Sequence, residues 1–301
     1  MAVPVIFGPT AVGKTQLAIE LAKNINGEII SADSMQVYRG LDIGTAKPTL
    51  AERQGIPHHL IDIRNPDEEW TVSDFIEESK KAEVISKKNG KTPIIVGGTG
   101  LYLWSLLEGF AFPITPADKE VRARLEKELT PTLYSQLSSV DPAAASKIHA
   151  NDRKRLIRAL EVFEVTGKPI SGLQKLRLEE PRRSVAGSEY LLIGLNLERA
   201  DLYARINARV DSMLAKGLIE EVKGLLAKGC TKDLRSMQAL GYKEAIEYLA
   251  GHWTKGQMTE ELETRTRNFA RRQLTWFRRF KDVHWLEANS LSLSELCALV
   301  S

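Results

Sequence analysis

One short segment near the N-terminus limits the folds that are open to this chain. Residues 8–15 read Gly-Pro-Thr-Ala-Val-Gly-Lys-Thr and match the pattern G-x-x-x-x-G-K-[ST]. The apolar run at 3–7 precedes the match, and apolar residues at three- and four-residue spacings follow it at 14–25. A strand, a glycine-rich turn and a helix in this order are typical of a phosphate-binding loop, so the sequence predicts an α/β fold that binds a polyphosphate.

The residue types in this loop suit a phosphate ligand. Backbone N–H groups converge on the anion, and the start of the following helix adds partial positive charge. We expect Lys14 to reach the outer phosphate and the Thr15 hydroxyl to hold Mg²⁺. Ligand contacts are expected from the whole loop, that is from Gly8, Pro9, Thr10, Ala11, Val12, Gly13, Lys14 and Thr15. The motif alone does not tell which polyphosphate binds.

Strand-like and helix-like segments alternate over the first hundred residues. Short apolar runs at 28–31, 59–62 and 93–96 indicate buried strands, and residues 72–88 have helical periodicity. Such alternation predicts a P-loop-type parallel sheet with helices on both faces. A later run, 190–195, indicates one more strand of this sheet.

Only helical patterns occur between about residues 116 and 183, where several prolines separate them. Since 190–195 is expected to return to the sheet, this stretch would be an insertion rather than a C-terminal domain. We therefore expect a catalytic core of residues 1–115 and 184–301 and an inserted all-helical subdomain of residues 116–183. A long helix is expected at about 257–280.

Composition excludes several classes of protein. With 43% hydrophobic and 27% charged residues and a net charge of +3, the chain is of the ordinary globular kind. Its longest apolar runs are far shorter than the roughly 20 residues that span a bilayer. The N-terminus has no export signal, and two cysteines cannot make a disulfide framework. We expect a cytoplasmic protein with no membrane partner, and a monomer.

One segment, 264–281, combines seven basic residues with aromatic ones and has no acidic residue. Guanidinium groups neutralise phosphates and aromatic rings stack on unpaired bases, so this mixture suits nucleic acid. An amphipathic helix with its aromatics in the core and its arginines in water would have the same composition. The segment alone leaves both interpretations open.

The best-placed carboxylate is Asp33, which follows the strand at 28–31. Carboxyl ends of parallel strands meet at one edge of the sheet, so Asp33 is expected to face the phosphate loop, although a turn or capping role is the alternative. A P-loop kinase of a small metabolite, with the insertion as its lid, would use such a residue. Its weak point is the short Walker B candidate at 60–62. A non-catalytic RNA-binding module would leave the phosphate loop unexplained.

Taken together, several segments resemble one family, the tRNA dimethylallyltransferases, also called tRNA isopentenyltransferases. The resemblance covers residues 4 to about 286 and rests on the phosphate loop, 31–48, 57–62, 97–102, Asn151 and Asp152 with Arg155 and Arg158, 241–244 and 271–278. Eukaryotic members can add a C-terminal zinc finger. This sequence ends without one, so we expect the bacterial form.

The resemblance implies a defined reaction. A dimethylallyl group would pass from dimethylallyl pyrophosphate to the N6 amine of the adenosine 3′ of the anticodon, position 37, in tRNAs that read codons beginning with U. The products would be N6-isopentenyladenosine and diphosphate. The phosphate loop would then bind the donor's pyrophosphate with Mg²⁺ and no nucleotide. ATP binding would be suggested by the motif only.

The resemblance also implies catalytic roles. Charge that builds up on the leaving pyrophosphate would be stabilised by the loop amides, Thr10 and Lys14, and Asp33 would accept the proton of the adenine amine. Arg205 and Arg209 lie four residues apart on one expected helix face. We expect Arg205 to clamp the pyrophosphate and Arg209 to be an exposed, ion-pairing residue. A structural role is expected for His58 and His59, and a place at the border of the active site is the alternative for one of them.

Residues on both parts of the chain would contact the anticodon stem-loop. Asp33 to Gln36 would line the pocket of the target base, which must be flipped out of the loop. Thr99 would cap a helix and contact the substrate. The full set of expected tRNA contacts is Asp33, Ser34, Met35, Gln36, Thr99, Arg122, Lys154, Arg155, Leu156, Ile157, Arg158, Gln238, Gly241, Tyr242, Lys243, Arg271, Arg272, Gln273, Thr275, Trp276 and Arg278.

Overall fold

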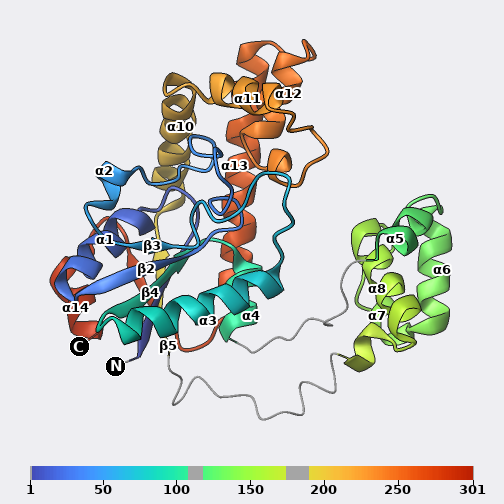
Figure 1. Ribbon diagram of the computed structural model, residues 1–301, viewed down its shortest axis with the longest axis horizontal. Coiled ribbons are helices and arrows are strands. Elements are labelled where there is room, and N and C mark those ends of the chain that lie inside the picture. Colours follow the sequence, from blue (N-terminus) through green and yellow to red (C-terminus); the bar gives the residue numbers. More distant parts are fainter. Residues whose placement is uncertain (1, 108–117, 174–189, 301) are drawn as a thin grey trace. The chain divides into compact units, whose positions relative to one another are not determined.

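A six-stranded parallel sheet organises the larger part of the molecule (Figure 1). The structure, a computed structural model, describes residues 2–107, 118–173 and 190–300. The strand order is β3-β2-β4-β1-β5-β6. The strands are β1 (Val3–Phe7), β2 (Gly27–Ala32), β3 (His58–His59), β4 (Thr92–Gly97), β5 (Tyr190–Asn196) and β6 (His284–Glu287). The expected parallel sheet, with its late strand at 190–195, is confirmed.

Two details of the sheet differ from the expectation. The strand expected at 59–62 is only two residues long, because Leu60 and Asp62 adopt positive φ angles of 62° and 58° and turn the chain away from β2. Strand β6 was not expected, since its burial pattern is mostly exposed and resembles that of a loop. It pairs with β5, where the ring of Trp285 lies so close to Gly194 that a Cβ there would be 2.7 Å from it.

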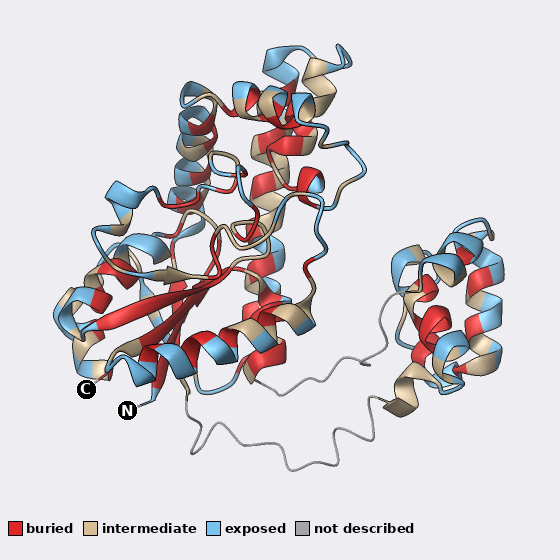
Figure 2. Ribbon diagram, in the orientation of Figure 1, coloured by how far each residue is buried: buried red, intermediate tan, exposed pale blue. Residues whose placement is uncertain are grey.

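Helices cover both faces of the sheet. In β1, alternate side chains enter two separate cores, so that Val5 and Phe7 pack on one face and Ile6 on the other. Figure 2 shows the strands as mostly buried. The helices of this part are α1 (Lys14–Asn24), α2 (Leu50–Arg53), α3 (Val72–Lys88), α4 (Gly100–Leu107), α10 (Arg199–Ala215), α11 (Leu218–Ala227), η1 (Ser236–Gln238), α12 (Tyr242–Leu249), α13 (Lys255–Phe277) and α14 (Leu293–Val300).

Helix α13 crosses much of the core. A capping box between Thr254 and Gln257 starts it, and residues buried at four- and three-residue steps, from Met258 to Phe277, form its inner stripe. Its exposed side carries arginines. Both interpretations of segment 264–281 therefore hold in part, because Phe277 and Phe280 lie in the core while Arg271, Arg272 and Arg278 are exposed.

A second compact unit, residues 108–183, interrupts the core, which comprises 1–107 and 184–301. The expected domain borders, 115/116 and 183/184, lie outside the described residues. Leu125, Leu133, Leu137, Leu156 and Leu160 form a core inside this unit. Its helices are α5 (Lys119–Leu125), α6 (Thr130–Val140), α7 (Pro142–Ala145) and α8 (Arg153–Thr166).

A buried carboxylate ties α5 to α8 in this unit. The Glu161 side chain is fully buried and accepts hydrogen bonds from Arg122 at 2.9 Å, Arg158 at 2.8 Å and the backbone N–H of Asp118 at 2.9 Å. Burial alone would raise the pKa of Glu161, but the two arginines outweigh it and hold the pKa below the ordinary 4.5. Across 2–107, 118–173 and 190–300, no helix has the length and apolar character needed to cross a bilayer.

We expect Glu161→Ala to lower the free energy of unfolding of this unit by about 2–4 kcal/mol, because two arginines lose a shared buried partner. Urea unfolding followed by hydrogen exchange in α5 and α8 measures the loss. Because the folded pKa is lowered, the contribution of Glu161 is present above pH 4.5 and is lost as the pH falls through that lowered value. The control is Glu164→Ala, whose ion pair with Arg124 is on the surface. Equal losses in both variants would contradict the assignment.

Candidate active site

A cavity of about 350 Å³ opens where strands β1, β2 and β4 end. The phosphate loop, the turn at 33–36 and the turn at 97–99 each follow one of these strands and line it. Helices α10 and α13 supply further side chains, among them Arg209, Arg272 and Phe269. Apolar residues, including Ala18, Val96 and Met213, line other parts of the same cavity. The cavity therefore combines basic side chains with apolar surface.

The phosphate loop closes around the Lys14 side chain. Its Nζ donates hydrogen bonds to the carbonyls of Gly8 at 2.9 Å and Pro9 at 2.8 Å. Gly13, with φ of 105°, makes the left-handed turn that starts α1. Burial, with a smaller effect from the nearby positive charge of Arg209, lowers the pKa of Lys14 to about 7, and Asp33 opposes this shift. A bound anion would restore the charge of this lysine.

The structure places the two arginines of α10 differently from the expectation. Arg209 lines the cavity, donates to the carbonyl of Thr45 at 3.4 Å, and has its pKa lowered by burial, with Asp33 opposing that shift. The expectation that Arg209 is an exposed ion-pairing residue is wrong. Arg205 is exposed and contacts the carbonyl of Val12 and Asn289 from outside the cavity. Its catalytic role stays a prediction.

Asp33 holds a turn and faces the cavity at once. Its Oδ1 accepts hydrogen bonds from the backbone N–H groups of Met35 at 2.8 Å and Gln36 at 3.2 Å. The hydroxyl of Thr99 accepts the N–H of Ser34 at 3.1 Å, which joins the turns at 33–36 and 97–99. The two interpretations of Asp33, turn residue and site residue, are therefore compatible.

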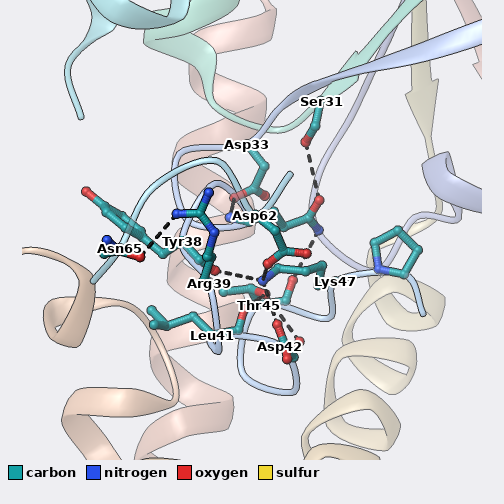
Figure 3. A network of polar contacts seen from close by, with 12 residues as sticks. Ser31, Asp33, Tyr38, Arg39, Leu41, Asp42, Thr45, Lys47, Asp62 and Asn65 are labelled. Atoms are coloured by element: carbon teal, nitrogen blue, oxygen red, sulfur yellow. Dashed lines mark hydrogen bonds and ion pairs between the residues drawn. The ribbon is translucent and has the colours of Figure 1, made fainter. Parts of the chain in front are cut away.

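A buried lysine shapes the segment that follows this turn (Figure 3). The Lys47 side chain is 4% exposed, and its Nζ donates to the Tyr38 carbonyl at 2.7 Å, to Asp42 at 2.5 Å and to Asp62 at 2.6 Å. These bonds hold residues 38–47 as one unit, from which Thr45 reaches the cavity. The sequence analysis did not assign Lys47 a role of its own, because its partners are set only by the fold.

A second carboxylate anchors the same segment from α11. Glu221 accepts the N–H of Ile43 at 2.8 Å and the hydroxyl of Tyr242 at 2.5 Å. The Tyr242 ring is fully buried and leaves no room for a Cβ at Gly44, which would lie 2.3 Å from it. Tyr242 and the equally buried Gly241 are thus structural, and the expected tRNA contact through the Tyr242 side chain is wrong.

The other expected tRNA contacts fall into three groups. Eight of them line the cavity, namely Ser34, Met35, Gln36, Thr99, Gln238, Lys243, Arg272 and Gln273. Arg271, Thr275 and Arg278 are exposed on or next to α13, and Trp276 is half-buried with the Arg279 guanidinium 4.8 Å from its ring. Among the eight residues that line the cavity, Gln273 points into the core, where its Oε1 and its Nε2 each make a hydrogen bond.

The remaining expected contacts belong to the helical unit. Lys154 and Arg155 are exposed there, whereas Arg122 and Arg158 are paired with Glu161. Leu156 and Ile157 are core residues, so the expectation that their side chains meet RNA is wrong. On α8, the exposed Lys154 and Arg155 are followed directly by the buried Leu156 and Ile157, because successive residues of a helix point to different sides.

The parallel sheet, the phosphate loop and a cavity containing Lys14, Arg209 and Asp33 define a P-loop-type α/β protein with a site for a phosphate-bearing substrate. A family model described as IPP transferase matches residues 36–280, which is most of the chain. The chain belongs to this family. Membership of the IPP transferase family, which is neither a kinase family nor a non-catalytic one, contradicts the metabolite kinase and the non-catalytic RNA-binding module.

Named relatives align with nearly the whole chain. The tRNA dimethylallyltransferase of Pelotomaculum thermopropionicum is 47% identical over 98% of this chain and 93% of its own length. That of Thermoanaerobacter pseudethanolicus is 50% identical over 93% of this chain and 90% of its own length.

Solved structures show the same fold. The tRNA isopentenylpyrophosphate transferase of Bacillus halodurans has a TM-score of 0.73 and 41% identity, covering 99% of this chain and 95% of that one. A eukaryotic dimethylallyltransferase acting on tRNA has a TM-score of 0.81 and 33% identity, covering 95% of this chain and 73% of that one.

We expect the wild-type protein to take up about one proton more than Lys14→Met when it binds inorganic pyrophosphate at pH 8, but almost none more at pH 6. Lys14 has a pKa of about 7 in the ligand-free protein, so it is mostly neutral at pH 8, and the bound anion raises its pKa. Calorimetry in buffers of different ionisation enthalpy counts the protons. Lys14→Met is the control, because it keeps the proton exchange of the pyrophosphate and lacks that of the lysine. Equal uptake in this variant would assign the proton to another group.

Proposed function

We propose that this chain transfers the dimethylallyl group of dimethylallyl pyrophosphate to the N6 amine of adenosine 37 in tRNAs that read codons beginning with U. N6-isopentenyladenosine and diphosphate are the products. The observation that carries the proposal is the meeting of Lys14, Arg209 and Asp33 at one cavity, which provides cations for a leaving pyrophosphate and an acceptor for a proton. Family membership supports it.

The leaving group determines the first requirement. As the allylic C–O bond breaks, negative charge grows on the pyrophosphate and positive charge on the allyl carbon, so catalysis depends on stabilising the anion. The loop amides, Lys14 and Arg209 supply that stabilisation. The apolar cavity surface around Val96 and Met213 suits a five-carbon chain and excludes water from it.

The nucleophile determines the second requirement. An adenine amine is weakly nucleophilic, since its lone pair is delocalised into the ring, and it must lose a proton as the new bond forms. The two turn hydrogen bonds to Oδ1 of Asp33 fix the plane of its carboxylate. We assign Oδ2 as the acceptor of the N6 proton. Gln36, held by Ser31 at 3.3 Å, lies beside it in the base pocket.

Mg²⁺ fits this site as a partner of the substrate. Thr15 lines the cavity and offers a hydroxyl oxygen, which is a ligand that Mg²⁺ accepts. Among the residues that the structure describes, no cluster of three or more acidic, histidine or cysteine side chains could hold a metal by itself. The ion would therefore depend on the pyrophosphate oxygens, and when bound it would neutralise part of their charge.

Exposed basic residues provide the tRNA contacts in this proposal. The core offers Arg271, Arg272 and Arg278, and the helical unit offers Lys154 and Arg155. Such side chains neutralise backbone phosphates and position the anticodon stem-loop without reading its sequence. Selection of the target adenosine would then fall to the cavity, which only a flipped base can enter.

We expect Asp33→Asn to lower the single-turnover rate of prenyl transfer at least a hundredfold and to leave tRNA affinity within about tenfold. The asparagine keeps an oxygen that accepts the two turn hydrogen bonds, so the loss reports the missing base rather than a broken turn. Rapid-quench transfer assays and filter binding provide the two measurements. Transfer near the wild-type rate would remove Asp33 from the chemistry.

We expect Arg278→Ala and Arg155→Ala each to weaken tRNA binding and to lower its salt slope by about one, because each loses one phosphate contact. Pyrophosphate binding should stay at the wild-type level, since neither residue lines the cavity. Lys81→Ala, which removes an exposed ion-paired lysine of α3, is the control. Unchanged slopes in both arginine variants would contradict the proposed contacts.

A further inference from the structure

The carboxamide of Gln273 bridges two loops of the active site. Gln273 lies on α13 and is 5% exposed. Its Oε1 accepts the backbone N–H of Thr10 at 2.8 Å, and its Nε2 donates to the carbonyl of Gly98 at 2.8 Å. One side chain, 263 residues along the chain from Thr10, therefore connects the phosphate loop with the turn that follows β4.

The backbone around this contact leaves it little freedom. A Cβ at Gly98 would lie 2.4 Å from Nε2 of Gln273, and a Cβ at Gly100 would lie 2.7 Å from the side chain of Trp276. Glycine at both positions lets α13 approach the turn directly. The amide is thus held on both sides, and its position fixes that of Thr10.

The neighbours of Gln273 on α13 make a purely packing role a poor explanation. The other residues of its inner stripe are apolar or small, namely Met258, Leu262, Thr266, Ala270 and Phe277. A buried amide stabilises the fold only if both its ends are bonded, and an apolar side chain would fill the same space without that condition. Both ends of its amide already make a hydrogen bond inside the core.

We propose that Gln273 is a positioning residue that orients Thr10, so that the Thr10 hydroxyl meets the pyrophosphate leaving group. This inference rests on the proposed function. Thr10 lines the cavity, and its N–H is held by Gln273 rather than by the loop itself. Losing the bond lets the hydroxyl drift, and a displacement of about 1 Å can cost a hundredfold in rate.

The test is a double-mutant cycle with Gln273→Met, which keeps the length of the side chain, and Thr10→Ala, which removes the hydroxyl but keeps the N–H. At saturating substrates we expect Gln273→Met to lower the single-turnover rate ten- to a hundredfold with tRNA affinity within twofold. The double variant should be no more than about threefold slower than Thr10→Ala alone. Losses that multiply would overturn the proposal, and so would a Thr10→Ala variant at the wild-type rate.

A second variant covers the case in which Gln273→Met does not fold. In Gln273→Glu, the carboxylate keeps an acceptor for the Thr10 N–H but places a negative charge against the Gly98 carbonyl, whereas the protonated acid reproduces both hydrogen bonds. The single-turnover rate of this variant, relative to the wild type at the same pH, should therefore rise as the pH falls. A relative rate that does not rise, or a multiplying loss with Thr10→Ala, would overturn the proposal. Gln136→Met, at an exposed position of α6, is the matched control. Wild-type protein that transfers nothing would instead contradict the proposed function.

Discussion

Parallel pairing of β2, β4 and β1 is the constraint on which the rest of the structure depends. Gly97 at the end of β4 is in register with Ala32 on one side and Phe7 on the other. The next residue of each strand is therefore the first of a loop, and the three loops start at the same level of the sheet. The phosphate loop, the Asp33 carboxylate and the Thr99 hydroxyl meet in one cavity because the three strands end at the same level.

The buried charges of the cavity are neutralised less completely than those elsewhere in the described structure. Lys14 and Arg209 are two cations at a buried anion site, and each is less basic than in water because burial disfavours its charge. Asp33 offsets part of this cost. Elsewhere the chain pairs buried charge fully, as around Lys47 and Glu161, where neighbouring acidic or basic groups complete the shell. The cluster that faces the cavity, by contrast, is incompletely neutralised.

Local sequence patterns predicted the phosphate loop, the parallel sheet and the long helix, since each depends on neighbours in the chain. They did not predict which of Arg205 and Arg209 faces inward, although Ile206, Val210 and Met213 mark the buried side of α10. The bridging role of Gln273 and the charge network of Lys47 depend on partners far away in sequence or on a turn at Asp62. Such contacts exist only once the sheet has formed.

The strand order also has a consequence for synthesis on the ribosome. Strand β1 lies between β4 and β5, but β5 follows β4 only after the whole helical unit has been made. At about 5–20 residues per second, the second edge of β1 stays unpaired for roughly 5–20 s. All five side chains of this strand end up buried, so its bare edge is a target for mispairing with other nascent chains. Chaperone dependence in cells would follow from this order of strands rather than from any weakness of the finished fold.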